Sequence, residues 1–315
     1  MSIDLAVIRA AHERIRDKIH RTPVLTSRRL DEACGAQLFF KCENFQKVGA
    51  FKARGATNAV FSLSEAEAAR GVATHSSGNH AAALARAARL RGVAAHIVMP
   101  SNSSAVKQAA VRGYGGQVIL SAPTLQAREE ACARVLAETG AAFIHPYNDY
   151  RVMAGQGTAA LELLEDVPDL DLILAPVGGG GLLSGTAIAA KGLQPGIQVI
   201  AAEPEQADDA RRSFQEGRII PAQANTIADG LRTSLGELNF PIIRANVDDI
   251  VTVSEAAIVA AMRQIWTTMK IIIEPSSAVP YAAIAEKKFA VAGRRVGIIL
   301  TGGNVDLDAL PWLKS

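Results

Sequence analysis

The sequence predicts an α/β fold in which helices cover mostly parallel sheets on both faces. Short runs rich in Val, Ile and Leu alternate along the chain with longer segments rich in Ala, Leu and Arg. The short runs are apolar throughout, which is typical of parallel strands that are buried on both faces. A length of 315 residues corresponds to about two domains, or to one large α/β domain.

This pattern places eight strands and seven helices along the chain. The strands are expected at residues 38–40, 72–75, 94–99, 117–120, 172–177, 199–203, 250–253 and 296–301. The helices are expected at residues 79–91, 105–112, 124–139, 152–164, 182–191, 254–270 and 277–288. Gly92 and Gly140 are predicted to end helices, because glycine readily adopts the left-handed conformation found there. Ser254 is predicted to cap the start of a helix.

Residues 1–19 are predicted to form an amphipathic surface helix. Leu5, Ile8, Ile15 and Ile19 fall on one helical face. Because charged residues are spread through this segment, it lacks the uncharged core of a signal peptide.

Charge and cysteine content exclude several classes of protein. The net charge at pH 7 is +2, so no general field attracts nucleic acid or an anionic membrane, and any anion site must be local. The three cysteines are an odd number without regular spacing. They argue against a disulfide framework and indicate a reducing compartment, the cytoplasm.

Nineteen uncharged residues lie between Asp171 and Lys191, close to the length of a membrane span. They include Pro176 and four consecutive glycines, residues 178–181. Each interior glycine costs a helix about 1 kcal/mol. The stretch is therefore predicted to form a buried strand, a glycine loop and a helix, and no membrane span.

The glycine loop is a candidate phosphate site, because its bare N–H groups lie at the positive end of a helix. It is not a Walker loop, since Thr186 stands where the lysine would be. Nor is it the dinucleotide fingerprint, whose third glycine is replaced by Leu183 or Ser184.

A second loop, residues 76–80 (SSGNH), lies between a strand and an Ala-rich helix. Its hydroxyl, amide and N–H groups suit a carboxylate or a phosphate, and a plain helix-capping turn is the alternative.

Lys52 stands between two apolar residues, Phe51 and Ala53. Burial would lower its pKa and make it a Schiff-base nucleophile, whereas a solvated loop lysine is the alternative. Thr301 follows an apolar strand, where a hydroxyl can bond a ligand ring. A lysine, a phosphate loop and a carboxylate-binding loop together indicate pyridoxal phosphate (PLP) acting on an amino acid.

In this order, these residues resemble the fold-type II PLP enzymes, and in particular serine/threonine dehydratases, serine racemases and 3-hydroxyaspartate dehydratases. The resemblance extends from residues 21–23 (RTP) to 303–306 (GNVD), with motifs at 154–158 (AGQGT), 202–204 (AEP), 227–230 (IADG) and 273–275 (IEP). It implies two open, twisted, mostly parallel sheets covered by helices, as in the tryptophan synthase β chain. It further implies a large domain of residues 1–60 plus 150–315, a small mobile domain of residues 61–149, and a homodimer.

The resemblance also implies roles for individual residues. Lys52 would hold the cofactor aldehyde and then remove the α-proton of the substrate. The other cofactor positions are Phe51 and Gly230 beside the ring, Asn79 at its hydroxyl, Gly178, Gly179, Gly180 and Gly181 at the phosphate, Thr301 at its nitrogen, and Glu274. Substrate would meet Ser76, Ser77, Asn79 and His80, and Ser77 matches the second proton donor of serine racemases.

Arg128 resembles a position in the racemase-like group that can reach a second carboxylate in the substrate pocket. An arginine fork suits a carboxylate, and His75 and Ser76 could assist it. We therefore expect β-elimination of 3-hydroxyaspartate to oxaloacetate and ammonia, although a surface arginine is the alternative reading. Serine racemase or L-serine dehydratase comes second, and threonine deaminase third.

The sequence disfavours two other classes of protein. A non-catalytic amino-acid-binding protein on this fold would be expected to lose Lys52 or the glycine loop, and both are intact. A nicotinamide dehydrogenase is disfavoured by the missing third glycine of its fingerprint.

A divalent-cation site is implied as well. Glu203, the carbonyl of Ala207, and Asp209 match the cation positions of the racemase-like group. Oxygen ligands with water suit Mg²⁺, Mn²⁺ or Ca²⁺ in a structural role. The alternative is a solvated acidic loop.

Overall fold

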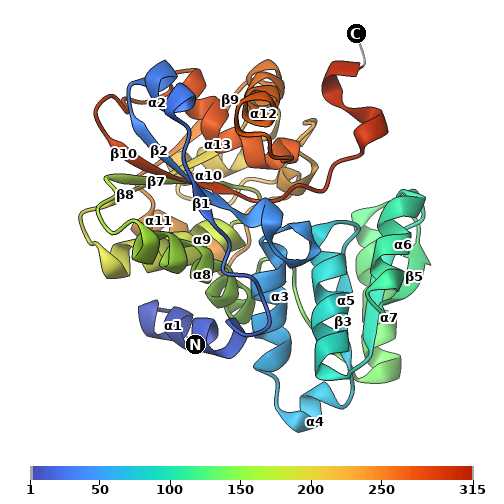
Figure 1. Cartoon of the computed structure of the whole chain (residues 1–315). Coiled ribbons are helices and arrows are strands. Elements are labelled where there is room, and N and C mark those ends of the chain that lie inside the picture. The colour runs from blue at the N-terminus through green and yellow to red at the C-terminus, as the bar shows by residue number, and fades with distance from the viewer. Residues whose placement is uncertain (1–2, 314–315) are drawn as a thin grey trace.

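The computed structural model describes residues 3–313 and contains two separate sheets, each flanked by helices (Figure 1). The larger sheet has six strands in the order β1-β2-β10-β7-β8-β9, all parallel except β1. Its strands are β1 (Val24–Leu25), β2 (Gln37–Cys42), β7 (Leu172–Pro176), β8 (Gln198–Pro204), β9 (Asp249–Val253) and β10 (Arg295–Leu300).

Helices cover both faces of this sheet, with α2, α12 and α13 on one side and α8, α9 and α11 on the other (Figure 1). In β7, Leu172 and Leu174 join the apolar core beneath α12 and α13, whereas Ile173 and Ala175 join the core beneath α8 and α9. Alternate side chains thus enter opposite cores, which is why the strand is apolar throughout. The helices are α1 (Leu5–Ile15), α2 (Arg28–Cys34), α8 (Tyr150–Asp166), α9 (Gly181–Leu193), α10 (Asp209–Glu216), α11 (Asn239–Asn246), α12 (Glu255–Met269) and α13 (Pro275–Ala285).

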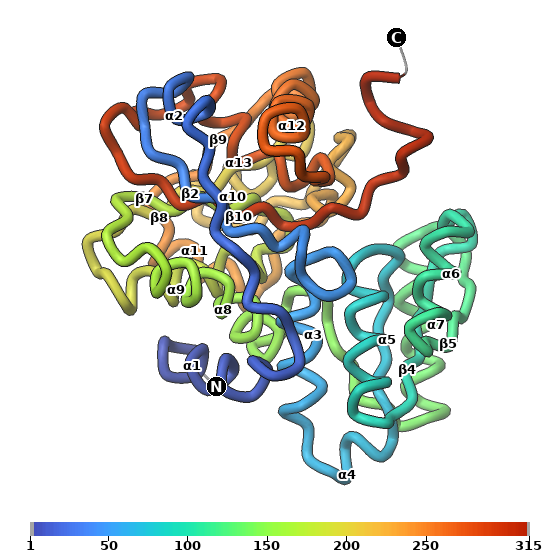
Figure 2. Tube along the Cα trace, viewed as in Figure 1, coloured from blue at the N-terminus to red at the C-terminus, as the bar shows by residue number. Residues whose placement is uncertain are grey.

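The smaller sheet is entirely parallel, in the order β5-β4-β3-β6. Figure 2 shows the chain entering this part of the molecule through α3 and α4. Its strands are β3 (Val72–His75), β4 (Ala95–Pro100), β5 (Gln117–Ser121) and β6 (Ala142–Phe143). The neighbouring helices are α3 (Lys52–Phe61), α4 (Glu65–Ala68), α5 (Asn79–Arg91), α6 (Ala105–Gly113) and α7 (Leu125–Thr139).

The expected α/β class, the eight strands and the seven helices are confirmed, with ends that differ by at most three residues. Gly92 and Gly140 end α5 and α7 with φ of 74° and 68°, and Ser254 Oγ accepts the N–H of Ala257 at 3.1 Å. The amphipathic N-terminal helix is present as α1 and buries Ile8 and Ile15, while residues 1 and 2 lie outside the described part of the chain.

Several elements were not predicted from the sequence. They are the two-residue strands β1 and β6 and the helices α2, α3, α4, α10 and α11. The error that matters for function concerns α3. The sequence predicts a loop around Lys52, whereas Lys52 lies in the first turn of this helix. The smaller sheet lies within residues 72–143, inside the expected small domain, and the domain boundaries stay a prediction.

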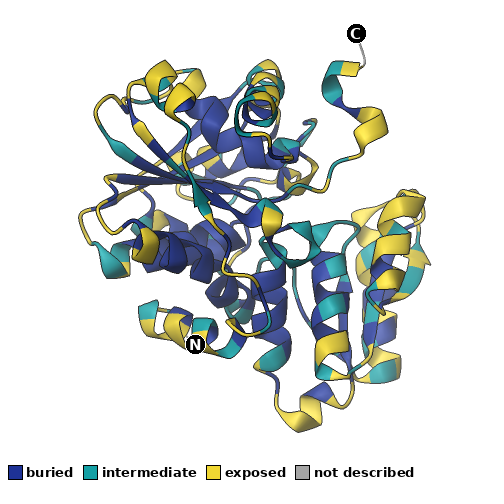
Figure 3. Ribbon diagram, in the orientation of Figure 1, coloured by how far each residue is buried: buried dark blue, intermediate teal, exposed yellow. Residues whose placement is uncertain are grey.

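The uncharged stretch after Asp171 forms β7, the glycine loop and most of α9, as predicted. Among residues 3–313, no helix is both long and apolar enough to span a membrane. Figure 3 shows that the helices beneath the larger sheet are buried over much of their length. The uncharged residues are therefore explained by burial inside the fold.

Candidate active site

The loops at the carboxyl ends of strands from both sheets converge on one cavity of about 510 Å³. This is the place where ligands bind in open parallel sheets, and the volume suits a small cofactor with its substrate. Every residue predicted to serve catalysis, cofactor binding or substrate binding lines this cavity. These residues are Phe51, Lys52, Ser76, Ser77, Asn79, His80, Arg128, Gly178, Gly179, Gly180, Gly181, Gly230, Glu274 and Thr301.

Lys52 is the first residue of α3 and extends into the cavity wall. Its Nζ donates a hydrogen bond of 2.8 Å to the carbonyl oxygen of Pro146 and lies 5.2 Å from the ring centre of Phe51. Burial lowers the pKa of Lys52 to about 8, while the nearby carboxylate of Glu274 acts in the opposite direction. The amine is therefore easier to deprotonate than an ordinary lysine, which suits a nucleophile or a base.

The glycine loop joins β7 to α9 and supplies N–H groups without protein partners. Within residues 3–313, no backbone acceptor pairs with the N–H groups of Gly178, Gly179 and Gly180. The first turn of α9 adds further N–H groups that have no intrahelical acceptor. Gly180 has a φ of +93°, and a Cβ on Gly179 would overlap the ring of Tyr147. Both the backbone and the packing therefore require glycine here, and the loop forms an anion-binding cradle.

Asn79, at the start of α5, connects the two halves of the site. Its Nδ2 donates to both carboxylate oxygens of Glu274, at 3.0 and 3.2 Å, and its Oδ1 accepts from Asn304 Nδ2 at 2.9 Å. Burial, followed by the charge of Asp229, raises the pKa of Glu274 to about 7. Thr301 is buried, with its hydroxyl 3.0 Å from that of Ser277.

Arg128 belongs to α7 and lines the cavity together with His75, His145 and Tyr147, and the Tyr147 ring packs against Gly179 of the glycine loop. Burial lowers the pKa of His75, and the positive charge of Arg128 lowers it further. His145 Nδ1 accepts the N–H groups of Tyr147 and Asn148 at 3.2 and 2.9 Å. Burial lowers the pKa of His145 to about 4, so this ring is neutral with its proton on Nε2.

The lining of the cavity thus offers a perturbed lysine, an anion cradle and an arginine. The family model described as "Pyridoxal-phosphate dependent enzyme" matches residues 15–302. The chain belongs to this family of PLP-dependent enzymes. PLP is accordingly its cofactor, and the fold expected from the resemblance is confirmed.

Members of this PLP family with high sequence identity include two hydroxyaspartate enzymes. A protein named beta-hydroxyaspartate dehydratase from Paracoccus denitrificans is 57% identical over 304 residues, which cover 96% of each chain. L-threo-3-hydroxyaspartate ammonia-lyase from Saccharomyces cerevisiae is 49% identical and covers 97% of this chain and 94% of its own. The crystal structure of serine racemase from Dictyostelium discoideum has a TM-score of 0.94 and 51% identity, covering 97% of this chain and 99% of that one.

The residues present fit PLP. The cofactor carries an aldehyde, for which Lys52 is the amine within the cavity, and a phosphate, for which the glycine loop offers free N–H groups. The ring would lie between these two points, beside Asn79 and Thr301. His145 and Tyr147 were not predicted as cavity residues, because the short strand that precedes them, β6, was not recognised.

The expected cation residues lie outside this cavity, at the end of β8 and the start of α10. Glu203 accepts the N–H groups of Ala210 and Arg211 at 3.2 and 2.7 Å, and Asp209 Oδ2 is buried with no hydrogen-bond partner among residues 3–313. Burial raises the pKa of Glu203 to about 9 and that of Asp209 to about 7. Two buried carboxylates and the carbonyl of Ala207 fit an oxygen-liganded cation completed by water.

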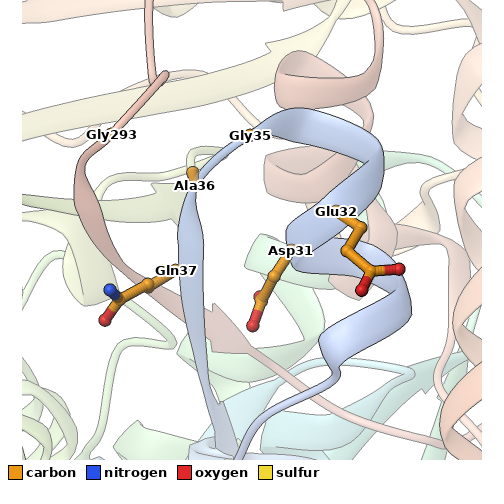
Figure 4. Close-up of a pocket in the computed structure, with 6 residues that line it drawn as sticks. All are labelled: Asp31, Glu32, Gly35, Ala36, Gln37 and Gly293. Carbon is orange, nitrogen blue, oxygen red and sulfur yellow. The ribbon is translucent and has the colours of Figure 1, made fainter.

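A second, shallower pocket of about 270 Å³ lies at the opposite end of β2 (Figure 4). Six residues line it: Asp31, Glu32, Gly35, Ala36, Gln37 and Gly293. One of its two carboxylates, that of Asp31, already accepts the N–H of Leu38 at 2.9 Å. This pocket therefore lacks the combination of amine, anion cradle and arginine found in the larger cavity.

Proposed function

We propose that this chain is a PLP-dependent ammonia-lyase that converts 3-hydroxyaspartate to oxaloacetate and ammonia. The observation that carries the proposal is that Arg128 lines the same cavity as Lys52 and the glycine loop. A substrate with one carboxylate has no group to pair with Arg128, whereas the second carboxylate of a dicarboxylic substrate can form an ion pair with its guanidinium. The names of the two hydroxyaspartate enzymes that are similar to the chain support the same choice.

The proposed roles are assigned to the residues that line the cavity. When bound, PLP supplies an electron sink that acidifies the substrate α-proton. Lys52 accepts that proton, since a pKa of about 8 leaves part of the amine unprotonated near neutrality. Gly178–Gly181 would hold the cofactor phosphate, and Phe51, Asn79, Gly230, Glu274 and Thr301, which line the same cavity, would lie near its ring.

The two substrate carboxylates would lie at different helices. One would face the N-terminal end of α5, where Ser76 and Ser77 of the preceding loop and Asn79 and His80 of the helix line the cavity. Burial and the charge of Lys52 hold the pKa of His80 well below its usual value, and its Nε2 lies 3.2 Å from the carbonyl oxygen of Ile144. The second carboxylate pairs with Arg128 on α7. This arrangement orients the β-carbon between the two anchors.

Serine racemase is the second candidate, and Ser77 is the observation that favours it. Its side chain lines the cavity, where it could donate a proton to the face of the substrate opposite Lys52. Such a donor permits racemisation of serine as a side reaction of the same site.

A steady-state panel tests these proposals. L-Serine, L-threonine and the threo and erythro isomers of 3-hydroxyaspartate are supplied in turn, and keto acid and ammonia are measured. We expect the highest kcat/KM with one hydroxyaspartate isomer. Lys52→Ala should abolish both turnover and the visible absorbance of the bound cofactor, which also excludes a non-catalytic binding protein. Higher kcat/KM with serine or threonine would refute the hydroxyaspartate assignment.

We also propose a structural Mg²⁺, Mn²⁺ or Ca²⁺ ion at Glu203, Ala207 and Asp209, supported by the unpartnered Asp209 oxygen. A homodimer and a cytoplasmic location remain proposals from the family resemblance and the cysteine content. Analytical ultracentrifugation tests the homodimer, and cell fractionation tests the location.

A further inference from the structure

Four charged side chains lie fully buried outside the active-site cavity. Lys41, Glu43, Arg54 and Glu162 are each at most 1% exposed. They come from β2, the turn after it, α3 and α8. Lys41 Nζ donates to Glu162 Oε2 at 2.7 Å and to the carbonyl oxygen of Thr22 at 2.7 Å. No step of the proposed reaction uses this group of charges.

Arg54 is the centre of the cluster, because its guanidinium engages both carboxylates. It donates to Glu43 through Nε and Nη2 at 2.7 and 2.8 Å. It donates to Glu162 through Nη1 and Nη2, both at 2.8 Å, and to Thr158 Oγ1 at 3.1 Å. Two bidentate contacts fix the plane of the guanidinium, which a single ion pair would not do.

The position of Arg54 on α3 determines which side of this helix the two carboxylates hold in place. Arg54 follows Lys52 by two residues, both within the first turn of the helix. Successive residues of an α-helix are rotated by about 100°, so the two side chains leave the helix about 200° apart. Arg54 therefore anchors the side of α3 opposite to the one that presents Lys52 to the cavity.

Helix α8 adds a second constraint through two glycines. A Cβ on Gly155 would lie 2.6 Å from the Arg54 carbonyl oxygen and 2.6 Å from Gly55 Cα in α3. A Cβ on Gly157 would lie 2.7 Å from the carbonyl oxygen of Gly185 in α9. Because α3 and α9 both begin at the active site, the buried α8 (Figure 3) sets the spacing between the lysine and the phosphate cradle.

Stability alone does not account for this cluster. Well-packed apolar residues often replace buried ion pairs with no loss of stability. Apolar contacts have no fixed direction, so they would not hold one side of α3, the helix that carries Lys52, in a single orientation.

We propose that Arg54, together with Glu43 and Glu162, is a positioning group that fixes the rotation of α3 and so aims the Lys52 amine at the cofactor site. The inference rests on the proposed role of Lys52.

The test compares Arg54→Lys with a matched control, Arg295→Lys. Arg295 is partly exposed and donates three hydrogen bonds, to Asp169 and Gln37, at the other end of the larger sheet, so this control changes an arginine with several partners away from α3. Cofactor-free protein is mixed with PLP, whose aldehyde condenses with the Lys52 amine with loss of water. Borohydride reduces the resulting C=N bond, and peptide mass spectrometry locates and times the adduct. Turnover and thermal unfolding are measured in parallel.

We expect Arg54→Lys to slow the capture of PLP by Lys52 and to lower kcat, each by about 10- to 100-fold, because small misplacements of a reacting group are this costly. KM should change by less than about threefold, since the substrate contacts are untouched. Arg295→Lys should stay within about twofold of wild type in both rates.

An Arg54→Lys protein that captures PLP at the wild-type rate would overturn the positioning role and leave the proposed function intact. Wild-type protein that forms no adduct at Lys52 would overturn both. If Arg54→Lys does not fold, Thr158→Val decides, because it removes one acceptor of Arg54 and keeps both carboxylates. It should slow capture by about two- to tenfold, and an unchanged rate would overturn the inference.

Discussion

Replacing Arg128 should remove the preference for a dicarboxylic substrate while leaving the chemistry in place. The side chain of Arg128 lines the cavity and is partly exposed. Among residues 3–313, no carboxylate forms an ion pair with it, so its guanidinium is free to bind a ligand. Arg128→Gln keeps much of the length of the side chain and removes its charge.

The size of the effect follows from the contact that is lost. A hydrogen bond to a charged group contributes about 1.5–3 kcal/mol, which corresponds to about a 10- to 150-fold change in kcat/KM. Because Arg128 is partly exposed, water screens the interaction and favours the lower half of this range. The loss should appear with 3-hydroxyaspartate, whereas kcat/KM for L-serine should change by less than about threefold.

The assay measures kcat/KM for both substrates in wild-type protein, Arg128→Gln and Arg134→Gln. Arg134 is the matched control, because it is an exposed arginine on the same helix and does not line the cavity. An Arg128 variant that retains hydroxyaspartate turnover would refute the substrate assignment. An equal fall in kcat/KM for 3-hydroxyaspartate and for L-serine would instead mean that Arg128 supports the structure of the site and does not bind the second carboxylate.

Three other measurements address the amine, the cation site and the helix spacing. In cofactor-free protein, the rate at which PLP joins Lys52 should rise with pH and level off above about pH 8, because only the unprotonated amine reacts and burial lowers the pKa of Lys52 to about 8. A rate still rising steeply above pH 10 would contradict this. Added Mg²⁺, Mn²⁺ or Ca²⁺ at about 100 times its Kd should raise the free energy of unfolding by about 2.7 kcal/mol, as measured by thermal unfolding. Asp209→Asn should reduce this gain strongly, and an undiminished gain would place the ion elsewhere. Gly157→Ala should lower the free energy of unfolding in urea by about 1–3 kcal/mol, since its Cβ has no room between α8 and α9. Gly196→Ala, which meets no atom within 4 Å, should stay within about 1 kcal/mol of wild type, and equal losses in the two variants would contradict the packing argument.

The location of the site could be predicted because the topology of parallel sheets brings loops together. The sequence places Lys52, the loop at residues 76–80, the glycine loop and Thr301 far apart, yet all line one cavity. Ligand-binding loops follow the carboxyl ends of parallel strands, so the predicted strands group residues 76–80, the glycine loop and Thr301, whereas Lys52 lies in the first turn of α3 and joins them through its own chemistry. The chemistry of each loop is local, since glycine N–H groups, a lysine amine or a hydroxyl can be read without knowing their neighbours.

Helix α3 and the wall formed by His145 and Tyr147 could not be predicted in the same way. The segment of α3, residues 52–61, contains Gly55, Asn58 and two β-branched residues, which favour a helix weakly. It is helical because it packs closely against α8, as the contact between Gly55 and Gln156 shows. Such tertiary packing overrides local propensity, and a single sequence does not display it.

Arg54 shows most clearly where local reading of the sequence ends. Arginine is almost never fully buried unless it is paired, so its sequence context indicates a surface position. Its partners are Glu43, 11 positions earlier, and Glu162, 108 positions later. Neither carboxylate is distinguishable by sequence from the exposed ones. A residue that binds a ligand can be recognised from the chemistry of its own side chain. A buried cluster of ion pairs is defined by contacts between residues far apart in the sequence, which a single sequence does not display. The cluster is therefore visible only in the folded chain, and the slower capture of PLP expected in Arg54→Lys tests whether these charges position Lys52.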